Sequence, residues 1–304
     1  RRAPSPALTR SGSLCALATP FRAHADALDL DAFGQLIDYQ IAGGTRALVV
    51  AGSTGEAAAL DDAEYSTLLE FAVARVGGRV PLLAGSGLPA TRKTIAQTQR
   101  AAAAGVGFAL VVAPAYVRPT QEGMYRHFCE VAEHGGLPVV LYNVPSRTSC
   151  DLLPETVARL ATHGNIVGIK EAVPAIERMR ALVSLGSACF SVLSGDDSSA
   201  LQALLAGADG VVSVAANVAP HLFASLCEAG VAGNAERAQA IDERLRLLYA
   251  LLGVEPNPIP VKWCLSAIGI GEPRLRLPLI ELSAAHRMAA NKVLNGLGLI
   301  EKAP

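Results

Sequence analysis

The feature that most constrains the fold is a series of eight short apolar runs, each followed by a segment with helical spacing. The runs are apolar at consecutive rather than alternate positions, which is typical of parallel strands covered on both faces. They begin at Leu14, Ala47, Pro81, Ala109, Val139, Ile166, Ser191 and Gly210. Eight such units predict an α/β fold of the (β/α)8 TIM barrel type. A doubly wound open sheet is the alternative fold.

The pattern changes after Gly233, where helical periodicity continues without another strand. Residues 235–252 are rich in Ala, Arg, Glu and Leu and predict one long helix. The prolines within 255–260 predict a stiff, extended connector before two further helical stretches. We therefore expect a loose N-terminal extension at 1–12, a catalytic barrel at 13–233 and a small all-helical appendage at 234–304.

Charge and composition restrict the class of partner and the cell compartment. The chain has 26 basic and 27 acidic residues, so it lacks the basic field that would hold nucleic acid or an anionic membrane. Its longest apolar stretch, 106–117, is shorter than the ~20 residues of a membrane span. Six cysteines without a C-x-x-C spacing indicate reduced thiols rather than disulfides or a zinc site. These features predict a cytoplasmic protein with a small-molecule partner.

Two pairs of polar residues are given structural rather than chemical roles. His127 and His134 share a helical face by spacing, but no carboxylate or cysteine completes a metal set, so we expect both to face solvent. Asp196 and Asp197 precede a predicted helix at 198–205, and we interpret them as its caps rather than as a catalytic pair. The sequence therefore predicts no bound metal.

Lys170 is the most informative candidate for chemistry. It is one of five lysines and the only one inside a strand-like apolar run, IVGIK. An ammonium that faces a barrel interior is costly unless it is neutralised or used. Burial favours the neutral amine, which is the form that adds to a ketone to give a Schiff base. The alternative is an ion pair with Glu171, although adjacent strand residues point to opposite faces.

Other polar residues follow the predicted strands, where the loops of a TIM barrel build the active site. In the loop 51–56, the hydroxyls of Ser53 and Thr54 and nearby N–H groups can hold a carboxylate, although a plain tight turn explains the loop equally well. Tyr142 can relay protons through such a hydroxyl, and Arg147 can bind a carboxylate with its planar fork. A core tyrosine and a surface arginine are the alternatives.

Five strings together make the sequence resemble a known family. They are GSTGE at Gly52, YNVPSRTSCDLLPET at Tyr142, GIKEA at Gly168, SGDD at Ser194 and VEPNPIPVKW at Val254. In combination they closely resemble the dihydrodipicolinate synthases, members of the pyruvate-dependent class I aldolase superfamily, over essentially all of residues 12–300. The resemblance implies a lyase of lysine and diaminopimelate biosynthesis that condenses pyruvate with L-aspartate 4-semialdehyde. It implies no cofactor, because pyruvate forms an imine with Lys170.

The resemblance also implies a proton relay and an oligomer. Tyr142 corresponds to the family's proton donor and acceptor beside the imine. Ser53, where many relatives have threonine, links it to Tyr116, which the family inserts from a neighbouring subunit. The resemblance therefore implies a homo-oligomer, commonly a tetramer built as a dimer of dimers.

Four further positions correspond to substrate-binding groups of the family. Thr54 would bind the carboxylate of pyruvate, and backbone groups at Gly195 and Val212 would shape the pocket. Arg147 would bind the carboxylate of the semialdehyde.

The sequence departs from lysine-inhibited members of the family at the pocket that binds the inhibitor. By alignment, the positions of that pocket hold Ala115, Asp62, Tyr65, Pro89 and Lys93. Lys93 places a cation where the ammonium of the inhibitor needs an acceptor, and like charges repel. We therefore predict that lysine does not inhibit this enzyme.

Two other functions fit part of the same pattern. N-acetylneuraminate lyases and 2-keto-3-deoxy-sugar aldolases would share Lys170 and Tyr142, so only the acceptor side separates them. Arg147 favours a short acidic aldehyde over a sugar. A non-catalytic sensor of keto acids is the remaining alternative, and the presence of every relay partner disfavours it.

Overall fold

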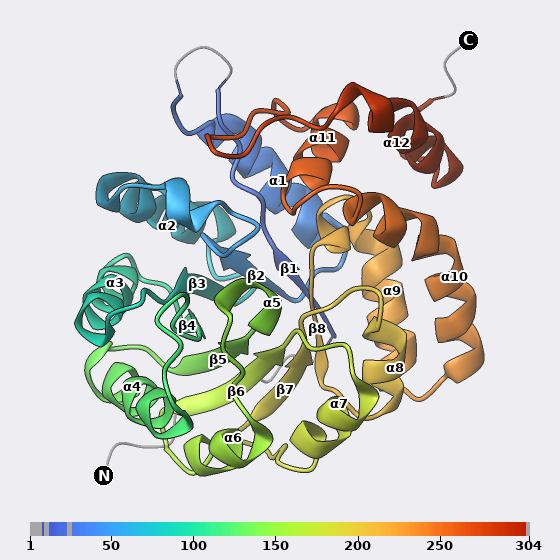
Figure 1. Cartoon of the computed structure of the whole chain (residues 1–304). Helices are drawn as coiled ribbons and strands as arrows, with labels where there is room; N and C mark the ends of the chain where they lie inside the picture. The colour runs from blue at the N-terminus through green and yellow to red at the C-terminus, as the bar shows by residue number, and fades with distance from the viewer. Residues whose placement is uncertain (1–7, 9–11, 23–25, 302–304) are drawn as a thin grey trace.

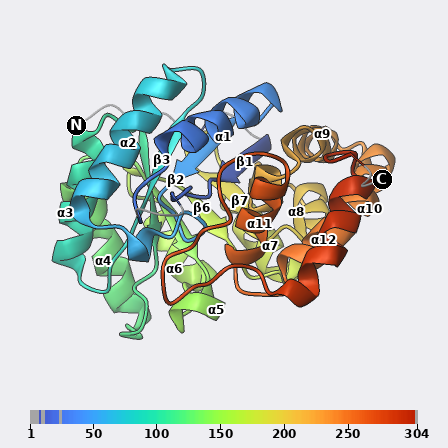
Figure 2. The same ribbon diagram turned by 90° about the horizontal axis from the view of Figure 1, so that it is seen from above.

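The computed structural model describes residues 8, 12–22 and 26–301, and Figures 1 and 2 show a closed barrel surrounded by helices. All eight strands are parallel and pair in sequence order, and the last pairs with the first. They are β1 (Gly12–Ala16), β2 (Ala47–Val50), β3 (Leu82–Ser86), β4 (Phe108–Val112), β5 (Val139–Asn143), β6 (Ile166–Glu171), β7 (Ser191–Ser194) and β8 (Gly210–Ser213). The predicted TIM barrel is confirmed, and the open sheet is excluded because the sheet has no edge.

The strands are apolar on both faces because each face is buried in a different core. One hydrophobic cluster fills the barrel and draws alternate residues from the strands, among them Leu14, Val49, Leu110, Val140 and Val212. The other residues of the strands pack outward against the helices in a second, larger cluster. Burial on both faces accounts for the consecutive apolar positions of the sequence.

Most of the predicted N-terminal extension lies outside the described residues. Leu8 is described, and its side chain is buried in the cluster that fills the barrel. The hydroxyl of Ser191, at the start of β7, donates a hydrogen bond of 3.3 Å to the carbonyl oxygen of Leu8.

Helices follow the strands, and the longer ones form an outer ring, whereas the short α5 lies over the barrel (Figure 1). They are α1 (Leu30–Ala42), α2 (Asp62–Val76), α3 (Thr91–Ala103), α4 (Gln121–His134), α5 (Pro145–Thr148), α6 (Pro154–Leu160), α7 (Ile176–Val183), α8 (Ala200–Leu205) and α9 (Pro220–Val231), with short 3-10 helices at Ala57–Ala59 and Ala215–Asn217. The start of α2 is a capping box: the Asp61 side chain accepts from the Glu64 N–H, and the Glu64 carboxylate accepts from the Asp61 N–H. No described helix combines the length and apolarity needed to span a bilayer.

Three further helices follow: α10 (Ala235–Leu252), α11 (Ile259–Ala267) and α12 (Ala284–Gly296) (Figure 2). Helix α10 packs against α8 and α9, and α11 and α12 pack against α10 and each other. The prediction of an extended connector at 255–260 is wrong. The chain turns between α10 and α11, and Pro260 lies in the first turn of α11. Proline is favoured there because the first helical N–H groups have no partner within the helix.

The prediction that His127 faces solvent is also wrong. Its side chain is buried between α3 and α4, where Nδ1 lies 2.9 Å from the hydroxyl of Thr91 and the ring meets Phe128 edge-on. Burial lowers the pKa of His127 to about 4. His134, about two turns further along the same helix, is exposed as predicted.

The buried imidazole of His127 is expected to make the fold sensitive to acid. Its folded pKa of about 4 lies below the unfolded value of ~6.5, so its contribution is complete above pH ~6.5 and is lost as the pH falls toward 4. Over that window, the free energy of unfolding should fall by about 2–3 kcal/mol more in the wild type than in His127→Gln. Urea unfolding at several pH values measures it. His134→Gln should keep the wild-type dependence, and an equal dependence in His127→Gln would refute the expectation.

Candidate active site

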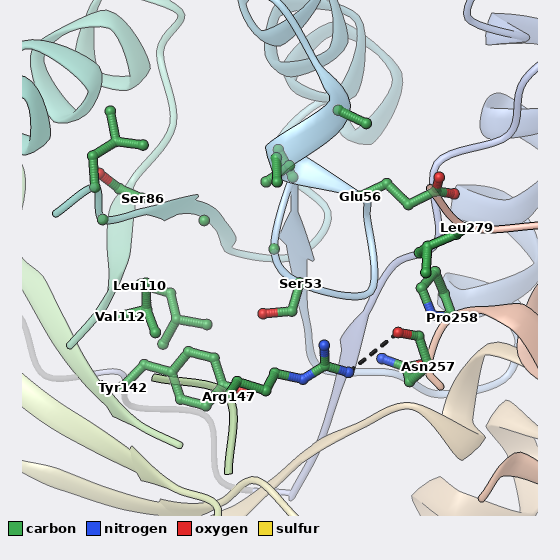
Figure 3. Close-up of a pocket in the computed structure, with 18 of the residues that line it drawn as sticks. Ser53, Glu56, Ser86, Leu110, Val112, Tyr142, Arg147, Asn257, Pro258 and Leu279 are labelled. Carbon is green, nitrogen blue, oxygen red and sulfur yellow. Dashed lines mark hydrogen bonds between the residues drawn. The ribbon is translucent and has the colours of Figure 1, made fainter. Parts of the chain in front are cut away.

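A cavity of about 480 Å³ opens at the carboxyl ends of the first strands. Its walls come from the loops after β2 and β3, from β5 and α5, and from the segments 256–258 and 276–279 of the C-terminal region. Among the predicted site residues, Ser53, Tyr142 and Arg147 line it (Figure 3). The cavity therefore joins residues of the barrel to residues that follow it in the chain.

Lys170 lies in β6 with its side chain directed into the barrel, next to Tyr142 of β5. The two residues are register partners, and Nζ of Lys170 lies 4.2 Å from the centre of the Tyr142 ring. Lys170 is 5% exposed, and no carboxylate of the described residues lies within ion-pair distance of its Nζ. The amine is thus enclosed without a neutralising partner, beside an aromatic ring that lines the cavity.

The alternative of an ion pair between Lys170 and Glu171 is not realised. Glu171 faces the outside of the barrel, where its carboxylate accepts hydrogen bonds from the Asn143 side chain at 3.0 Å and from the Val173 N–H at 2.8 Å. Arg178 of α7 lies 3.8 Å from it. Burial raises the pKa of Glu171. The opposite orientation of adjacent strand residues accounts for the separation.

Gly195 leaves room for the side chain of Lys170. A Cβ atom at position 195 would lie 2.7 Å from Cε of Lys170. A larger residue would displace the amine, so the absence of a side chain at Gly195 contributes directly to the position of Lys170.

The loop after β2 carries the two hydroxyls that the sequence analysis selected. Ser53 lines the cavity in Figure 3. Thr54 is buried, and its hydroxyl accepts a hydrogen bond of 3.0 Å from the side chain of Asn257. Non-glycine residues at both ends of the loop, Ala51 and Glu56, have positive φ angles of 54° and 53°. The loop is therefore a tightly turned segment rather than an extended one.

Arg147 lies in the short helix α5 at the rim of the cavity. Its Nη2 donates a hydrogen bond of 3.2 Å to the carbonyl oxygen of Asn257, which is drawn in Figure 3. The guanidinium is exposed and takes part in no ion pair within the described chain, so it can accept a further anionic partner.

Five predicted site residues are not among those that line the cavity: Lys170, Thr54 and Gly195, which are described above, and Tyr116 and Val212. Tyr116, on the loop after β4, is 89% exposed and has a φ of 73°. Val212 of β8 is buried in the cluster that fills the barrel. In a single chain, the structure therefore does not bring Tyr116 to Ser53.

The two aspartates after β7 behave differently from each other. Asp196 accepts a hydrogen bond of 2.9 Å from the Ser199 N–H just before α8, which begins two residues later than predicted. Asp197 does not cap that helix with its side chain. Its carboxylate accepts from the N–H groups of Val214 and Ala215 after β8, and burial raises its pKa to about 6.

Sequence reasoning missed the contribution of the C-terminal region. Asn257 contacts both Thr54 and Arg147, and Lys262 forms a buried ion pair with Glu56. Burial lowers the pKa of Lys262 to about 8. The available signal was a lysine in the otherwise apolar string IPVKW, the same kind of signal that selected Lys170.

Comparison with known proteins places these features in one family. Residues 9–297 match the model of the dihydrodipicolinate synthetase family. The 4-hydroxy-tetrahydrodipicolinate synthase of Xanthomonas campestris is 58% identical over 94% of each chain. That of Legionella pneumophila is 46% identical, over 95% of this chain and 99% of the relative.

Solved structures agree with this relationship. A chloride-inhibited dihydrodipicolinate synthase from Acinetobacter baumannii, complexed with pyruvate, superposes with a TM-score of 0.93 at 38% identity, covering 96% of this chain and 100% of that one. A structure described as a monomeric variant of dihydrodipicolinate synthase gives 0.94 at 40% identity, with 97% and 99% covered. The chain belongs to the dihydrodipicolinate synthetase family, as a TIM-barrel lyase.

Proposed function

We propose that the protein is a 4-hydroxy-tetrahydrodipicolinate synthase, which condenses pyruvate with L-aspartate 4-semialdehyde through an imine on Lys170. The observation that carries the proposal is the enclosed amine of Lys170, which has no carboxylate partner among the described residues and lies beside Tyr142. The names of the relatives support the same reaction. The proposed chemistry uses a covalent imine and no cofactor.

The reaction begins with attack of the Lys170 amine on C2 of pyruvate. The carbinolamine loses one water to give the imine, and removal of a proton from C3 gives an enamine. The enamine carbon forms the new bond to the aldehyde carbon of the semialdehyde. The amino group of the semialdehyde then attacks the imine carbon, closes the ring and releases Lys170, so the overall reaction expels one water.

Tyr142 is proposed to move protons at the imine, with Ser53 as the next group of the relay. Tyr142 and Ser53 line the same cavity, which supports this assignment. Tyr116 would complete the relay from a partner chain. Its aromatic side chain is almost fully exposed next to the half-exposed Val117, as expected for a residue that serves another subunit. We propose that the chains assemble as a dimer of dimers. Analytical ultracentrifugation that gives the mass of a single chain would contradict this arrangement.

We also propose which residues bind the carboxylates of the two substrates. Thr54 would bind the carboxylate of pyruvate, with Gly195 and Val212 as walls of that subsite. Arg147 would bind the carboxylate of the semialdehyde, because its guanidinium is at the cavity rim and free of ion pairs in the described chain. A cationic fork at this position favours a short acidic acceptor over a neutral sugar.

Arg147→Ala is expected to raise the KM for the semialdehyde by ~30- to 100-fold, because a charge-assisted bond to its carboxylate is lost. The KM for pyruvate should change less than about twofold, since the proposal assigns the carboxylate of pyruvate to Thr54 and not to Arg147. Steady-state kinetics with each substrate varied in turn measure both values. Arg147→Lys keeps the charge but loses the planar fork, so its KM for the semialdehyde should lie between those of the wild type and Arg147→Ala. An unchanged semialdehyde KM would remove Arg147 from the acceptor site.

Insensitivity to lysine is a further part of the proposal. At the aligned inhibitor positions, the hydroxyl of Tyr65 already donates to the carbonyl oxygen of Gly85, and Asp62 is paired with Arg100. Lys93 is exposed and adds a cation. We expect added L-lysine to leave the rate unchanged at millimolar concentration, with D-lysine as the control. Half-inhibition at sub-millimolar L-lysine would contradict this expectation.

A further inference from the structure

A buried ion pair connects the C-terminal region to the loop of Ser53 and Thr54. Nζ of Lys262, in α11, lies 2.5 Å from Oε1 of Glu56, and both side chains are 2% exposed. The other carboxylate oxygen accepts a hydrogen bond of 3.1 Å from the N–H of Arg276. Both oxygens of Glu56 are therefore held by residues that follow the barrel in the chain.

Glu56 is the residue at which this loop is fixed. Its φ of 53° lies in the left-handed region, which residues with a side chain adopt uncommonly. Its N–H donates to the carbonyl oxygen of Ser53 at 3.2 Å, so the same residue closes the turn that presents the hydroxyls. An uncommon backbone conformation persists where its surroundings fix it, and here the anchored carboxylate does so.

A buried ion pair is a poor means of gaining stability. Removing two charges from water is costly, and apolar side chains of similar size often serve stability equally well. The pair instead fixes the positions of the two side chains, because a short charge-assisted contact holds both partners in one geometry. The ammonium of Lys262 also lies 4.1 Å from the centre of the buried Phe21 ring, which restricts it further.

A second contact links the same region to the same loop. Asn257 donates to the hydroxyl of Thr54 at 3.0 Å and accepts from Arg147 at 3.2 Å. Asn257 therefore contacts both Thr54, the residue proposed to bind pyruvate, and Arg147, the residue proposed to bind the semialdehyde. The ion pair of Glu56 and Lys262, by contrast, holds only the loop of Ser53 and Thr54.

We propose that Glu56 and Lys262 are positioning residues, through which the C-terminal helices set the location of the Ser53 and Thr54 hydroxyls. The proposal rests on the proposed function for the roles of those two hydroxyls. It adds that the helical region after the barrel affects the reaction by positioning active-site groups, in addition to stabilising the fold.

The test replaces both charges at once in the double variant Glu56→Gln, Lys262→Met, because a single replacement would leave an unpaired buried charge and destabilise the fold. We expect a folded protein whose KM for pyruvate rises ~10-fold and whose kcat falls ~10- to 100-fold, as follows from small displacements of positioned groups. The KM for the semialdehyde should stay within about twofold. A purely structural pair would lower the melting temperature and leave these constants unchanged.

Glu64→Gln is the matched control. Glu64 accepts a hydrogen bond of 2.7 Å from Nη1 of Arg276, so this variant also weakens a charged link between the C-terminal region and the barrel. Glu64 makes no hydrogen bond to the loop at 51–56, and the contact by which Arg276 holds Glu56 is through its backbone N–H, which the substitution leaves in place. Glutamine preserves the capping box with Asp61. We expect a lower melting temperature with kinetic constants within about twofold of the wild type.

Hydrogen exchange of the amides at 52–57 provides a readout that does not depend on the reaction. We expect faster exchange there in the double variant and wild-type exchange in Glu64→Gln. If the wild type fails to turn over the semialdehyde, the proposed function fails while the exchange result still decides the positioning role. Wild-type exchange and wild-type pyruvate KM in a folded double variant would overturn the proposal.

Discussion

Replacing Lys170 by alanine is expected to reduce kcat by about 10⁴-fold or more, with the barrel intact. The reaction needs a neutral amine that forms a covalent bond with the keto acid. Lys262 is the other buried lysine of the described chain, and its ammonium is held by Glu56. Among the described residues, no second amine is therefore placed to substitute for Lys170. The measurement is turnover of the purified variant, accompanied by circular dichroism to establish folding.

Trapping with borohydride in the presence of pyruvate identifies the lysine that reacts. Peptide mapping of the wild type should place the reduced adduct on Lys170 and leave Lys262 unmodified. Lys170→Arg should form no adduct, since it keeps a positive charge but lacks the nucleophilic amine. An adduct on Lys262, or substantial turnover in Lys170→Ala, would contradict the assignment.

Replacing Tyr142 by phenylalanine is expected to reduce kcat by about 10²- to 10³-fold, because the proton donor and acceptor beside the imine is lost. The ring stays in place, so its packing in the barrel and its contact with Nζ of Lys170 persist. We expect the borohydride adduct still to form, but more slowly. Steady-state rates and the time course of trapping measure the two effects.

Tyr249→Phe is the matched control for this substitution. Tyr249 is a partly buried tyrosine of α10 whose hydroxyl lies 3.4 Å from Asp242, outside the cavity. Its loss should leave kcat within about twofold of the wild type. If Tyr142→Phe behaves like Tyr249→Phe, Tyr142 does not transfer protons and another group of the cavity must.

The sequence predicted the barrel because burial on two faces leaves a direct pattern in each strand. Every apolar run that was selected overlaps a strand, and the alternation of side chains placed Lys170 and Glu171 on opposite faces. The positions of Ser53, Tyr142 and Arg147 around one cavity follow from the same fold, since loops after parallel strands meet at one end.

The contacts that the sequence did not predict join residues far apart in the chain. Glu56 and Lys262 are separated by 206 positions, and Asn257 and Thr54 by 203. Helical periodicity indicates that one face of α11 is buried, but it does not identify the element that covers it. His127 was misplaced for a similar reason, because spacing alone does not show that α3 covers that part of α4.

The most direct test of the whole account is the oxidation of NADPH in an assay that couples this protein to a dihydrodipicolinate reductase. Pyruvate is supplied with L-aspartate 4-semialdehyde or, in a parallel reaction read as loss of pyruvate, with N-acetylmannosamine. We predict turnover with the semialdehyde and none with the sugar. Turnover with the sugar alone would contradict the proposed function and assign the enclosed amine of Lys170 to a sugar aldolase.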